Sequence, residues 1–441
     1  MNTQRFLRHP EVFMDIKKSP SHAGDRDTTF GTDGEVTLSK LPWPDDLPVR
    51  LIKGSLVLPD NKILLSVNLQ ISDAHTVYGL ARFSPTGNLD INFANGGLIT
   101  DRFPGGESHG GGRLLRLADG RLLMLGVRFT YQGPEPIPHL AMACYSSDYT
   151  LDTTFADQGH LVIENKGNEL CMPDLSRVVQ QSDGKLLVST TYYDFDHYTQ
   201  TTGCLLRIEL NGRLDLTFNQ TGRLDFKVQD PNAATAITAC LSQPDGKIVV
   251  AGHGFFQPAR ETAVIARFDS QGILDVSFGR RNSPGYYSVG LEDQVTRFND
   301  LVATSRGFIG IGQAGSQNHP STLGLLVGIT TNGSEDPAFN NGKPHVAKYH
   351  PEIDNAWICG LVQTDGKVIT STGRHYIYIS RWMDDGSVDD GFGDGGFVSE
   401  DTESSQQPII LSARVDNTFM WTGNTTGVGG GSTGKLINYL A

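Results

Sequence analysis

The segment 192–198 carries the residue types in this chain that are best suited to chemistry. It consists of Tyr192, Tyr193, Asp194, Phe195, Asp196, His197 and Tyr198. The spacing of its two aspartates and its histidine is compatible with a hard cation or a mixed metal site. Its aromatic rings favour a different role, recognition of a sugar or peptide, because rings stack on apolar surfaces while their hydroxyls bond outward. A solvated loop whose tyrosines cover neighbouring elements is the simplest interpretation.

No sequence-local catalytic motif accompanies this segment. The chain contains no G-x-S-x-G, H-E-x-x-H or P-loop sequence, and the Gly-rich stretch 427–434 lacks the Gly-Lys-Ser/Thr ending. The five cysteines, Cys144, Cys171, Cys204, Cys240 and Cys359, show no C-x-x-C spacing, so neither a zinc site nor a disulfide framework is indicated. We therefore predict no catalytic residues and no cofactor, with a bound divalent cation as the alternative.

A repeated signature defines the elements that must position any site. Asp-x-x-Phe occurs seven times, ending at Phe30, Phe93, Phe155, Phe218, Phe278, Phe339 and Phe392. A near-constant period of this length is typical of a repeat architecture. A ligand site rarely needs the same acidic residue seven times. We therefore expect Asp to accept backbone N–H groups in a turn and Phe to fill the gap between repeats.

Each repeat predicts four short strands. In the first complete repeat these are expected at 49–58, 63–69, 77–83 and 88–100, and the last one carries the signature. Asp-Gly turns recur between the first and second strands. The pattern predicts an all-β, seven-bladed β-propeller with four antiparallel strands per blade. Because the chain stops after a third strand and begins with an unaccompanied fourth at 25–39, we expect an N-terminal strand to complete the C-terminal blade.

The turn and the signature together resemble a known repeat. Gln-Pro-Asp-Gly-Lys-Ile at 243–248 and Ile-Leu-Asp-Val-Ser-Phe-Gly at 273–279 look like the delta-60 repeat of bacterial proteins, and the strand order is similar to that of NHL-type propellers. The resemblance covers residues 25–441, implies a single propeller domain, and leaves 1–24 as a tail. It transfers no catalytic motif. The fifth repeat departs from the pattern at Arg306 and at 280–282, which predicts a distorted blade.

The two faces of such a ring differ. Tight turns between strands one and two and strands three and four share one face, which is nearly uniform from blade to blade. The opposite, variable face collects aromatic, His and Asp residues. Besides 192–198, its predicted binding residues are Trp43, Tyr131, Phe255, Phe256 and Trp357.

A second group stands near the starts of the inner strands and is expected at the mouth of the central channel. Its members are His109, Asp174, Asn299, Asp300 and Asp354. A propeller enzyme would place a general base or a cation there. Polar residues that hydrate the channel are the simpler interpretation.

The leading hypothesis is a non-enzymatic recognition or scaffold propeller that binds a protein or glycan through the variable face. The alternatives are a metal-assisted hydrolase or lyase at the channel mouth and a structural domain of a secreted toxin or surface assembly. A net charge of −13 argues against nucleic-acid partners. We expect no membrane insertion, a monomer or a part of a larger assembly, and a location in the cytoplasm or export without a cleavable signal.

Overall fold

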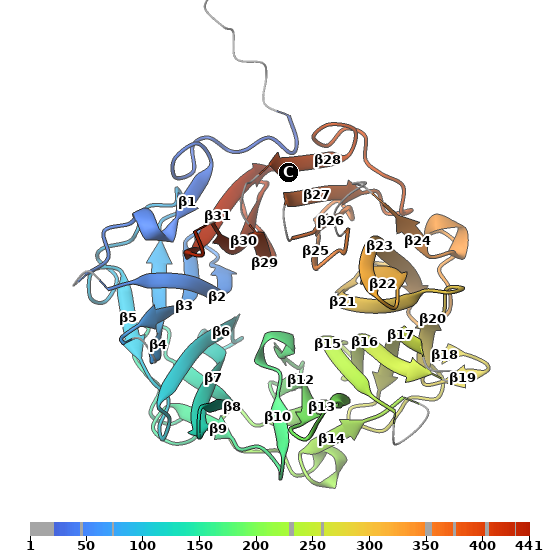
Figure 1. The fold of residues 1–441 in the computed structure, drawn as a ribbon, viewed down its shortest axis with the longest axis horizontal. Coiled ribbons are helices and arrows are strands. Elements are labelled where there is room, and N and C mark those ends of the chain that lie inside the picture. Colours follow the sequence, from blue (N-terminus) through green and yellow to red (C-terminus); the bar gives the residue numbers. More distant parts are fainter. Residues whose placement is uncertain are drawn as a thin grey trace, which may run out of the picture.

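Seven antiparallel sheets stand in a ring around a central axis (Figure 1). The structure, a computed structural model, describes residues 22–441 except 45–46, 73–74, 229–232, 257–259, 349–354, 374–375, 402–404 and 428; the side chains of residues 198, 320, 321 and 401 also lie outside the described part. The chain is an all-β, seven-bladed propeller, as its repeats predict.

Each blade is an antiparallel meander whose first strand lies nearest the axis. From inner to outer strand, blade 1 is β2 (Val49–Val57), β3 (Ile63–Gln70), β4 (Thr76–Phe83) and β5 (Leu98–Asp101); blade 2 is β6 (Ser108–Arg116), β7 (Leu122–Gln132), β8 (Glu135–Tyr145) and β9 (His160–Ile163); blade 3 is β10 (Glu169–Cys171) with β11 (Arg177–Gln180), then β12 (Leu186–Asp194), β13 (His197–Ile208) and β14 (Arg223–Phe226); and blade 4 is β15 (Thr235–Ser242), β16 (Ile248–Phe256), β17 (Arg260–Phe268) and β20 (Tyr286–Val289). Blade 5 is β21 (Val295–Ala303), β22 (Gly307–Ser316), β23 (His319–Thr330) and β24 (His345–Ala347); blade 6 is β25 (Cys359–Val362), β26 (Val368–Ser371), β27 (Tyr376–Trp382) and β28 (Phe397–Asp401); and blade 7 is β29 (Ser405–Ala413), β30 (Thr418–Thr426), β31 (Ser432–Leu440) and β1 (Glu35–Thr37).

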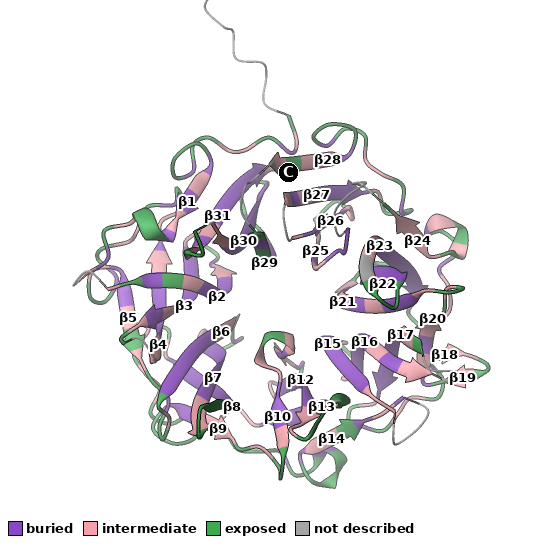
Figure 2. Ribbon diagram, in the orientation of Figure 1, coloured by how far each residue is buried: buried purple, intermediate pink, exposed green. Residues whose placement is uncertain are grey.

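The middle strands of the blades form the core. Figure 2 shows their residues mostly buried, whereas the connections between strands are largely exposed. Apolar side chains of neighbouring blades pack in continuous clusters, such as Leu125 and Leu140 of blade 2 with Val188 and Leu206 of blade 3. Stacking of sheets around the axis thus supplies the burial that a single small sheet lacks.

The two ends of the described chain meet in blade 7. β1 pairs antiparallel with β31, with Val36 opposite Leu436, so the first and last strands lie side by side (Figure 1). Upstream, the backbone N–H of Gly24 donates to the carbonyl of Leu440 at 2.9 Å. The prediction that an N-terminal strand completes the C-terminal blade is therefore confirmed.

Charged side chains reinforce this closure, which we call the clasp and define as residues 23–40 with β31. Arg26 Nε donates to Glu400 of blade 6 at 2.7 Å, and the hydroxyl of Tyr439 donates to the same carboxylate at 2.8 Å. Lys435 Nζ lies 3.1 Å from Glu35 Oε1. The clasp therefore holds blade 7 together and also attaches it to blade 6.

The Asp-x-x-Phe signature forms a turn rather than a strand, so the prediction of continuous strands at 88–100 and 25–39 is wrong in that part. In every copy the Phe N–H donates to the Asp carbonyl, as from Phe218 to Asp215 at 3.0 Å. In six copies the Asp side chain also accepts the N–H two residues on, at 3.0–3.1 Å. This local bonding replaces strand pairing, and only the few residues after the turn pair as the outer strand.

The signature joins one blade to the next. Each signature Phe is buried. A methyl group added to Gly272 in the neighbouring turn would come within 2.8 Å of the Phe218 ring, so the ring packs where only glycine leaves room. In six copies the residue after Phe donates its N–H to the neighbouring turn, as Asn219 does to Gln271 at 2.9 Å.

Ion pairs hold the signature Asp in place. In blade 3, Asp215 Oδ2 accepts Arg207 Nε at 2.6 Å and Lys185 Nζ at 2.7 Å, and the guanidinium of Arg207 lies over the Phe218 ring. Arg207 and Asp215 are both almost fully buried. A paired carboxylate of this kind is a structural element, as the sequence predicts.

Blades 2 and 5 lack the third-strand arginine and supply another. Arg121 reaches Asp152 at 2.9 Å, and Arg306 reaches Asp336 at 2.7 Å, each from the turn between the first two strands. In blade 5 the third-strand position is Gly328. Blade 5 pairs as a complete four-stranded meander, and its register shifts, between Phe298 and Asp300 and between Ala314 and Ser316, have counterparts in other blades, so no distortion peculiar to blade 5 is found at Arg306. Residues 279–284 instead form an extra hairpin, β18 (Gly279–Arg280) with β19 (Ser283–Pro284), in blade 4.

Candidate functional site

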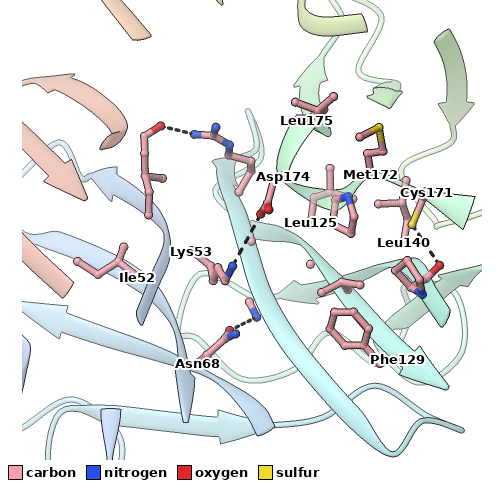
Figure 3. Close-up of a pocket in the computed structure, with 18 of the residues that line it drawn as sticks. Ile52, Lys53, Asn68, Leu125, Phe129, Leu140, Cys171, Met172, Asp174 and Leu175 are labelled. Atoms are coloured by element: carbon pink, nitrogen blue, oxygen red, sulfur yellow. Dashed lines mark hydrogen bonds and ion pairs between the residues drawn. The ribbon is translucent and has the colours of Figure 1, made fainter. Parts of the chain in front are cut away.

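A cavity of about 550 Å³ opens near the axis on the variable face. Blades 1, 2, 3 and 7 enclose it through their first and second strands, together with β8, the third strand of blade 2, and with residues 172–175 of blade 3. We call it the channel-mouth pocket; its lining includes Lys53, Asn68, Arg113, Phe129, Pro136, Pro138, Leu140, Met172, Asp174, Tyr193 and Gln407 (Figure 3). It combines cationic, amide and apolar groups in one concave site, which is typical of ligand-binding pockets.

Bulges in the inner strands direct the cationic residues. The pairing of β2 with β3 shifts between Ile52 and Gly54, which leaves Lys53 as the extra residue. The pairing of β6 with β7 shifts immediately before Arg113, across Gly111 and Gly112. A bulge re-aims a side chain out of the regular alternation. Glycine is required at 112, where a methyl group would lie 1.7 Å from a carbonyl oxygen of β7.

A short 3-10 turn, η3 (Pro173–Leu175), forms the lip of the pocket. It interrupts the inner strand of blade 3 between β10 and β11 and projects towards the axis (Figure 1, green). Arg177 Nη1 holds the turn by donating to the carbonyls of Asp174 at 3.1 Å and Ser176 at 3.0 Å. The Asp174 carboxylate is thereby placed 3.7 Å from Lys53 Nζ (Figure 3).

Arg113 spans from blade 2 to blade 7. Its Nη1 donates to the carbonyl of Ile409 at 2.9 Å, the one side-chain hydrogen bond that it makes within the described part of the chain. A guanidinium carries five N–H donors, so most of its donor capacity is open to another acceptor. Lost hydration lowers the pKa of Arg113, although an arginine remains protonated at neutral pH.

The interior of the channel next to the pocket is electrostatically unbalanced. Lost hydration and the positive charge of Arg113 lower the pKa of Arg177. On the opposite side, lost hydration raises the pKa of Asp300, whose carboxylate accepts the N–H groups of Leu301 at 2.9 Å and Gly360 at 3.0 Å. Two arginines thus lie near each other while Asp300, a carboxylate that attracts both, is bonded to backbone, an arrangement that favours an added anion.

The wall facing the cations is apolar. Phe129 of β7 and Leu140 of β8 line the pocket (Figure 3), and so does Pro138. The thiol of Cys171 donates to the Pro138 carbonyl at 3.3 Å and so fixes the wall to blade 3. All five cysteines are buried, and burial raises the pKa of Cys171 to about 12, so this thiol is a packing group.

Of the predicted binding residues, Tyr193 lines the pocket. Asp194 and His197 lie at the tip of the β12–β13 hairpin, where the carboxylate contacts the ring Nδ1 at 3.3 Å. Asp196 accepts the amide of Asn168 at 3.2 Å, and Phe195 is half-buried beside it. The side chain of Tyr198 is outside the described part.

Three predicted binding aromatics are buried and cannot contact a partner directly. Tyr192 packs under Arg223, whose guanidinium lies 4.7 Å from the ring centroid. Trp43 donates its indole N–H to the Leu38 carbonyl at 2.8 Å. Trp357 is wholly buried, as part of the core between blades 5 and 6.

The remaining predicted binding aromatics are half-buried on the variable face. Tyr131 packs edge-on against His75, with 6.4 Å between the ring centroids. Phe256 packs beside Tyr286 with a centroid distance of 6.1 Å, next to Phe255. None of these three lines the channel-mouth pocket.

The predicted channel-mouth group separates. Asp174 lines the pocket, and Asp300 lies in the channel beside it. Asn299 is occupied between blades, where its amide donates to the Trp357 carbonyl at 2.8 Å. His109 is buried in blade 2 near Phe103, and burial followed by nearby arginines lowers its pKa. Asp354 lies outside the described residues.

The cationic members of the site, Lys53 and Arg113, were not among the residues predicted from the sequence. Lys53 and Arg113 lie within inner strands, where a charge interrupts an otherwise apolar or glycine-rich run. Three consecutive glycines before Arg113 are the available signal, because such a run permits a bulge. The amide of Asn68, which accepts the N–H of Gly111 at 2.9 Å, was likewise not considered.

Two further properties concern metal binding and membrane insertion. Among the described residues, no three His, Cys, Asp or Glu side chains lie close enough together to hold a metal ion. Within the same ranges, no helix is long and apolar enough to cross a membrane.

Comparison with protein families links the repeats to a propeller model. The model described as "Domain of unknown function (DUF5122) beta-propeller" matches residues 181–218 and 243–278, well under half of the chain. Each matched segment runs from an Asp-Gly turn to a signature Phe. The match therefore supports a propeller repeat. No curated protein matches the chain in sequence.

Solved structures with a similar arrangement have varied functions. A protein of unknown function from Dyadobacter fermentans is 11% identical, with a TM-score of 0.48, 92% of this chain covered and 100% of that one. Drosophila plexin A, solved in complex with semaphorin 1b, is 9% identical, with a TM-score of 0.40 and coverage of 88% and 85%. The PQQ-bound aldose sugar dehydrogenase of Streptomyces coelicolor is 8% identical, with a TM-score of 0.35 and coverage of 92% and 98%. These values support no inference about activity or partners.

Proposed function

We propose that the protein is a non-enzymatic recognition propeller that binds a partner protein through its variable face, with one group of the partner seated in the channel-mouth pocket. The observation that carries the proposal is the pocket itself, a single concave site with cationic and apolar walls at the centre of that face. Paired strands and the η3 turn position its walls, which suits binding without rearrangement.

A protein partner fits the pocket better than a glycan does. Sugar sites depend on flat aromatic faces and many polar contacts. Here the wall is built mainly from aliphatic and proline residues such as Pro136, Pro138 and Leu140, with Phe129 and Tyr193 as its aromatic members. The long β7–β8 hairpin, Leu122–Gln132 with Glu135–Tyr145, extends beside the pocket and adds contact surface for a larger partner.

We further propose that the repeat is the delta-60 repeat of bacterial proteins. Support comes from the limits of the two matched segments, which contain the same turn and signature that carry the resemblance. This assignment names the architecture and adds nothing about the ligand.

A peptide-display selection tests the proposed function. Leu175→Glu places a carboxylate on the half-buried lip of the pocket, and Leu216→Glu, on an exposed signature residue outside it, is the matched control. We expect peptides selected on the wild-type protein to bind Leu175→Glu at least about tenfold more weakly, because desolvating an added charge is costly, and to bind Leu216→Glu unchanged.

The proposal fails if the selected peptides bind both variants equally well. A glycan array run in parallel gives the competing outcome. Sugars that bind the wild-type protein and lose affinity with Leu175→Glu, without any selected peptide, would reassign the pocket to glycans.

A further inference from the structure

Donor groups on one side of the channel-mouth pocket lack acceptors within the described part of the chain. Arg113 makes a single side-chain hydrogen bond, to the Ile409 carbonyl. Lys53 Nζ has only Asp174 near it, at 3.7 Å, which is beyond hydrogen-bond distance. Asn68 uses its carbonyl oxygen on a backbone N–H, and no described acceptor meets its NH₂ group. Three donors from two blades therefore face one cavity.

These donors form a local cationic centre in an acidic protein. The whole chain carries a net charge of −13, yet the carboxylates that lie near Lys53, Arg113 and Arg177 in the described ranges are those of Asp174 and Asp300. One of these carboxylates is bonded to backbone N–H groups and the other is largely exposed. Low-dielectric walls around the cavity strengthen the attraction for an anion.

The apolar wall lies across the same cavity. Among the apolar residues that line it, Pro136 is exposed and Phe129 is half-buried, whereas Pro138 and Leu140 are buried. A ligand that satisfies both sides must present an anion and an apolar group from nearly the same point. The last residue of a polypeptide does this, since its carboxylate and side chain share one Cα.

We infer that the channel-mouth pocket binds the C-terminal residue of a partner protein, with the carboxylate at Arg113 and Lys53 and an apolar side chain against Phe129 and Pro136. The inference rests on the proposed function for the role of the pocket as the recognition site. A guanidinium with free paired N–H groups suits a carboxylate, which it can bind through two parallel hydrogen bonds.

Asp174 competes with the incoming carboxylate for Lys53. The η3 turn fixes this side chain at the lip, where 82% of it is exposed. Removing its charge should release Lys53 and reduce repulsion of the ligand. Removing the charge of Asp174 should therefore strengthen binding of the carboxylate, whereas removing the charge of Lys53 should weaken it.

A matched pair of small probes tests the inference, namely N-acetyl-leucine and N-acetyl-leucinamide, which differ only in the charge of the terminal group. We expect NMR titration of the whole protein to show the acid binding at least about tenfold more tightly than the amide. Arg113→Gln should abolish the difference, Lys53→Gln should reduce it, and Asp174→Asn should tighten binding of the acid severalfold. Arg116→Gln, an exposed change on the same strand outside this pocket, should leave it unaltered.

Several outcomes would overturn the inference. Equal binding of acid and amide, or no binding of either, removes the carboxylate site. Binding of glucuronate in preference to N-acetyl-leucine reassigns the anion to a sugar acid.

Arg113→Gln could fail to fold, which circular dichroism would reveal. In that case Asp174→Asn, at a largely exposed side chain, tests the inference, because unchanged or weaker binding of N-acetyl-leucine would contradict it. Selected peptides that bind equally well with an amidated end would defeat this inference while leaving the proposed function intact.

Discussion

Asp215 is held as a carboxylate by its neighbours. Burial alone would raise its pKa, but hydrogen bonds from Lys185, Thr217 and Arg207 lower the pKa well below the ordinary range. The same competition lowers the pKa of Asp275 to about 2, with Ser277 as the main hydrogen-bond donor. These aspartates are charged in the folded protein under all mild conditions and belong to the framework.

Several histidines show the reverse behaviour. Burial lowers the pKa of His253 to about 4, and it lowers the pKa values of His109, His139 and His345 as well. These rings are neutral in the folded chain and become protonated more readily when the chain unfolds. Protonation therefore favours the unfolded state.

We expect the free energy of unfolding to fall in two stages as pH decreases. Between about pH 6.5 and pH 4 the unfolded chain binds protons at histidines that stay neutral when folded, and His253 alone accounts for roughly 1–3 kcal/mol. Between about pH 4 and pH 2 the unfolded chain protonates aspartates that stay charged when folded, such as Asp275. Urea midpoints measured across this range check both stages.

Two variants separate the stages. His253→Gln should flatten the first stage and leave the second, whereas Asp275→Asn should reduce the second and leave the first. A urea midpoint that stays constant from pH 6.5 to pH 4.5 in the wild-type protein would contradict the assignment of the histidines.

Residue types alone did not determine which side chains are buried and which line the pocket. Tyr192 and Tyr193 are adjacent and chemically alike, but neighbours on a strand point to opposite sides. The structure buries Tyr192 and directs Tyr193 to the pocket. Lys53 could not be found by this alternation, because the bulge that aims it shifts the strand register by one residue.

The strand and turn elements were more predictable. Asp-Gly turns and the spacing of apolar runs place most strands within a few residues of their observed bounds. The outer strands are the exception. There the signature Asp bonds within its own turn and strand pairing is lost, and residue preferences do not say which of these two arrangements is the more stable. Blade 5 illustrates a related limit. Its third strand lacks the arginine that pairs with the signature Asp, and Arg306, from the turn between the first two strands, pairs with Asp336 instead.

Arg306→Asp tests this replacement. The change restores the Asp-Gly pattern of the other turns but removes the partner of Asp336 and adds a carboxylate near Asp384. We expect it to lower the stability by about 2–4 kcal/mol, because Asp336 is nearly buried and would lose its countercharge. Thermal and urea unfolding measure the loss.

Arg281→Asp is the control for the charge change. Arg281 is exposed in the hairpin formed by β18 and β19 of blade 4. The same substitution there should alter stability by less than about 0.5 kcal/mol. If Arg306→Asp were as stable as the wild type, the pair would be incidental and blade 5 would be held by packing alone.

The whole ring depends on its closure. Repeats at a near-constant period predict a ring of similar blades, and the incomplete repeats at both ends predict the clasp. The position of the pocket could not be predicted in the same way. It arises where blade 3 splits its inner strand at the η3 turn, a feature of a single blade that the shared repeat pattern does not contain.

Opening the clasp should destabilise the entire molecule. A chain that begins at Lys40 loses β1 together with the buried side chains of Phe30, Val36 and Leu38, whereas a chain that begins at His22 keeps every contact described above. Removing one buried Phe costs about 3–5 kcal/mol, and the other lost contacts add to this. We expect a fall in melting temperature of roughly 10 °C for the shorter chain.

Cooperativity gives a second readout of closure. In a closed ring each blade has two neighbours, so unfolding of one exposes the apolar faces of both and the ring melts as a unit. Without β1, blade 7 is left with an unpaired edge on β31, and the melting transition should broaden as this blade unfolds first. Calorimetry of the two truncated chains decides the point, because equal melting temperatures and equally sharp transitions would mean that the clasp contributes nothing to the stability of the ring.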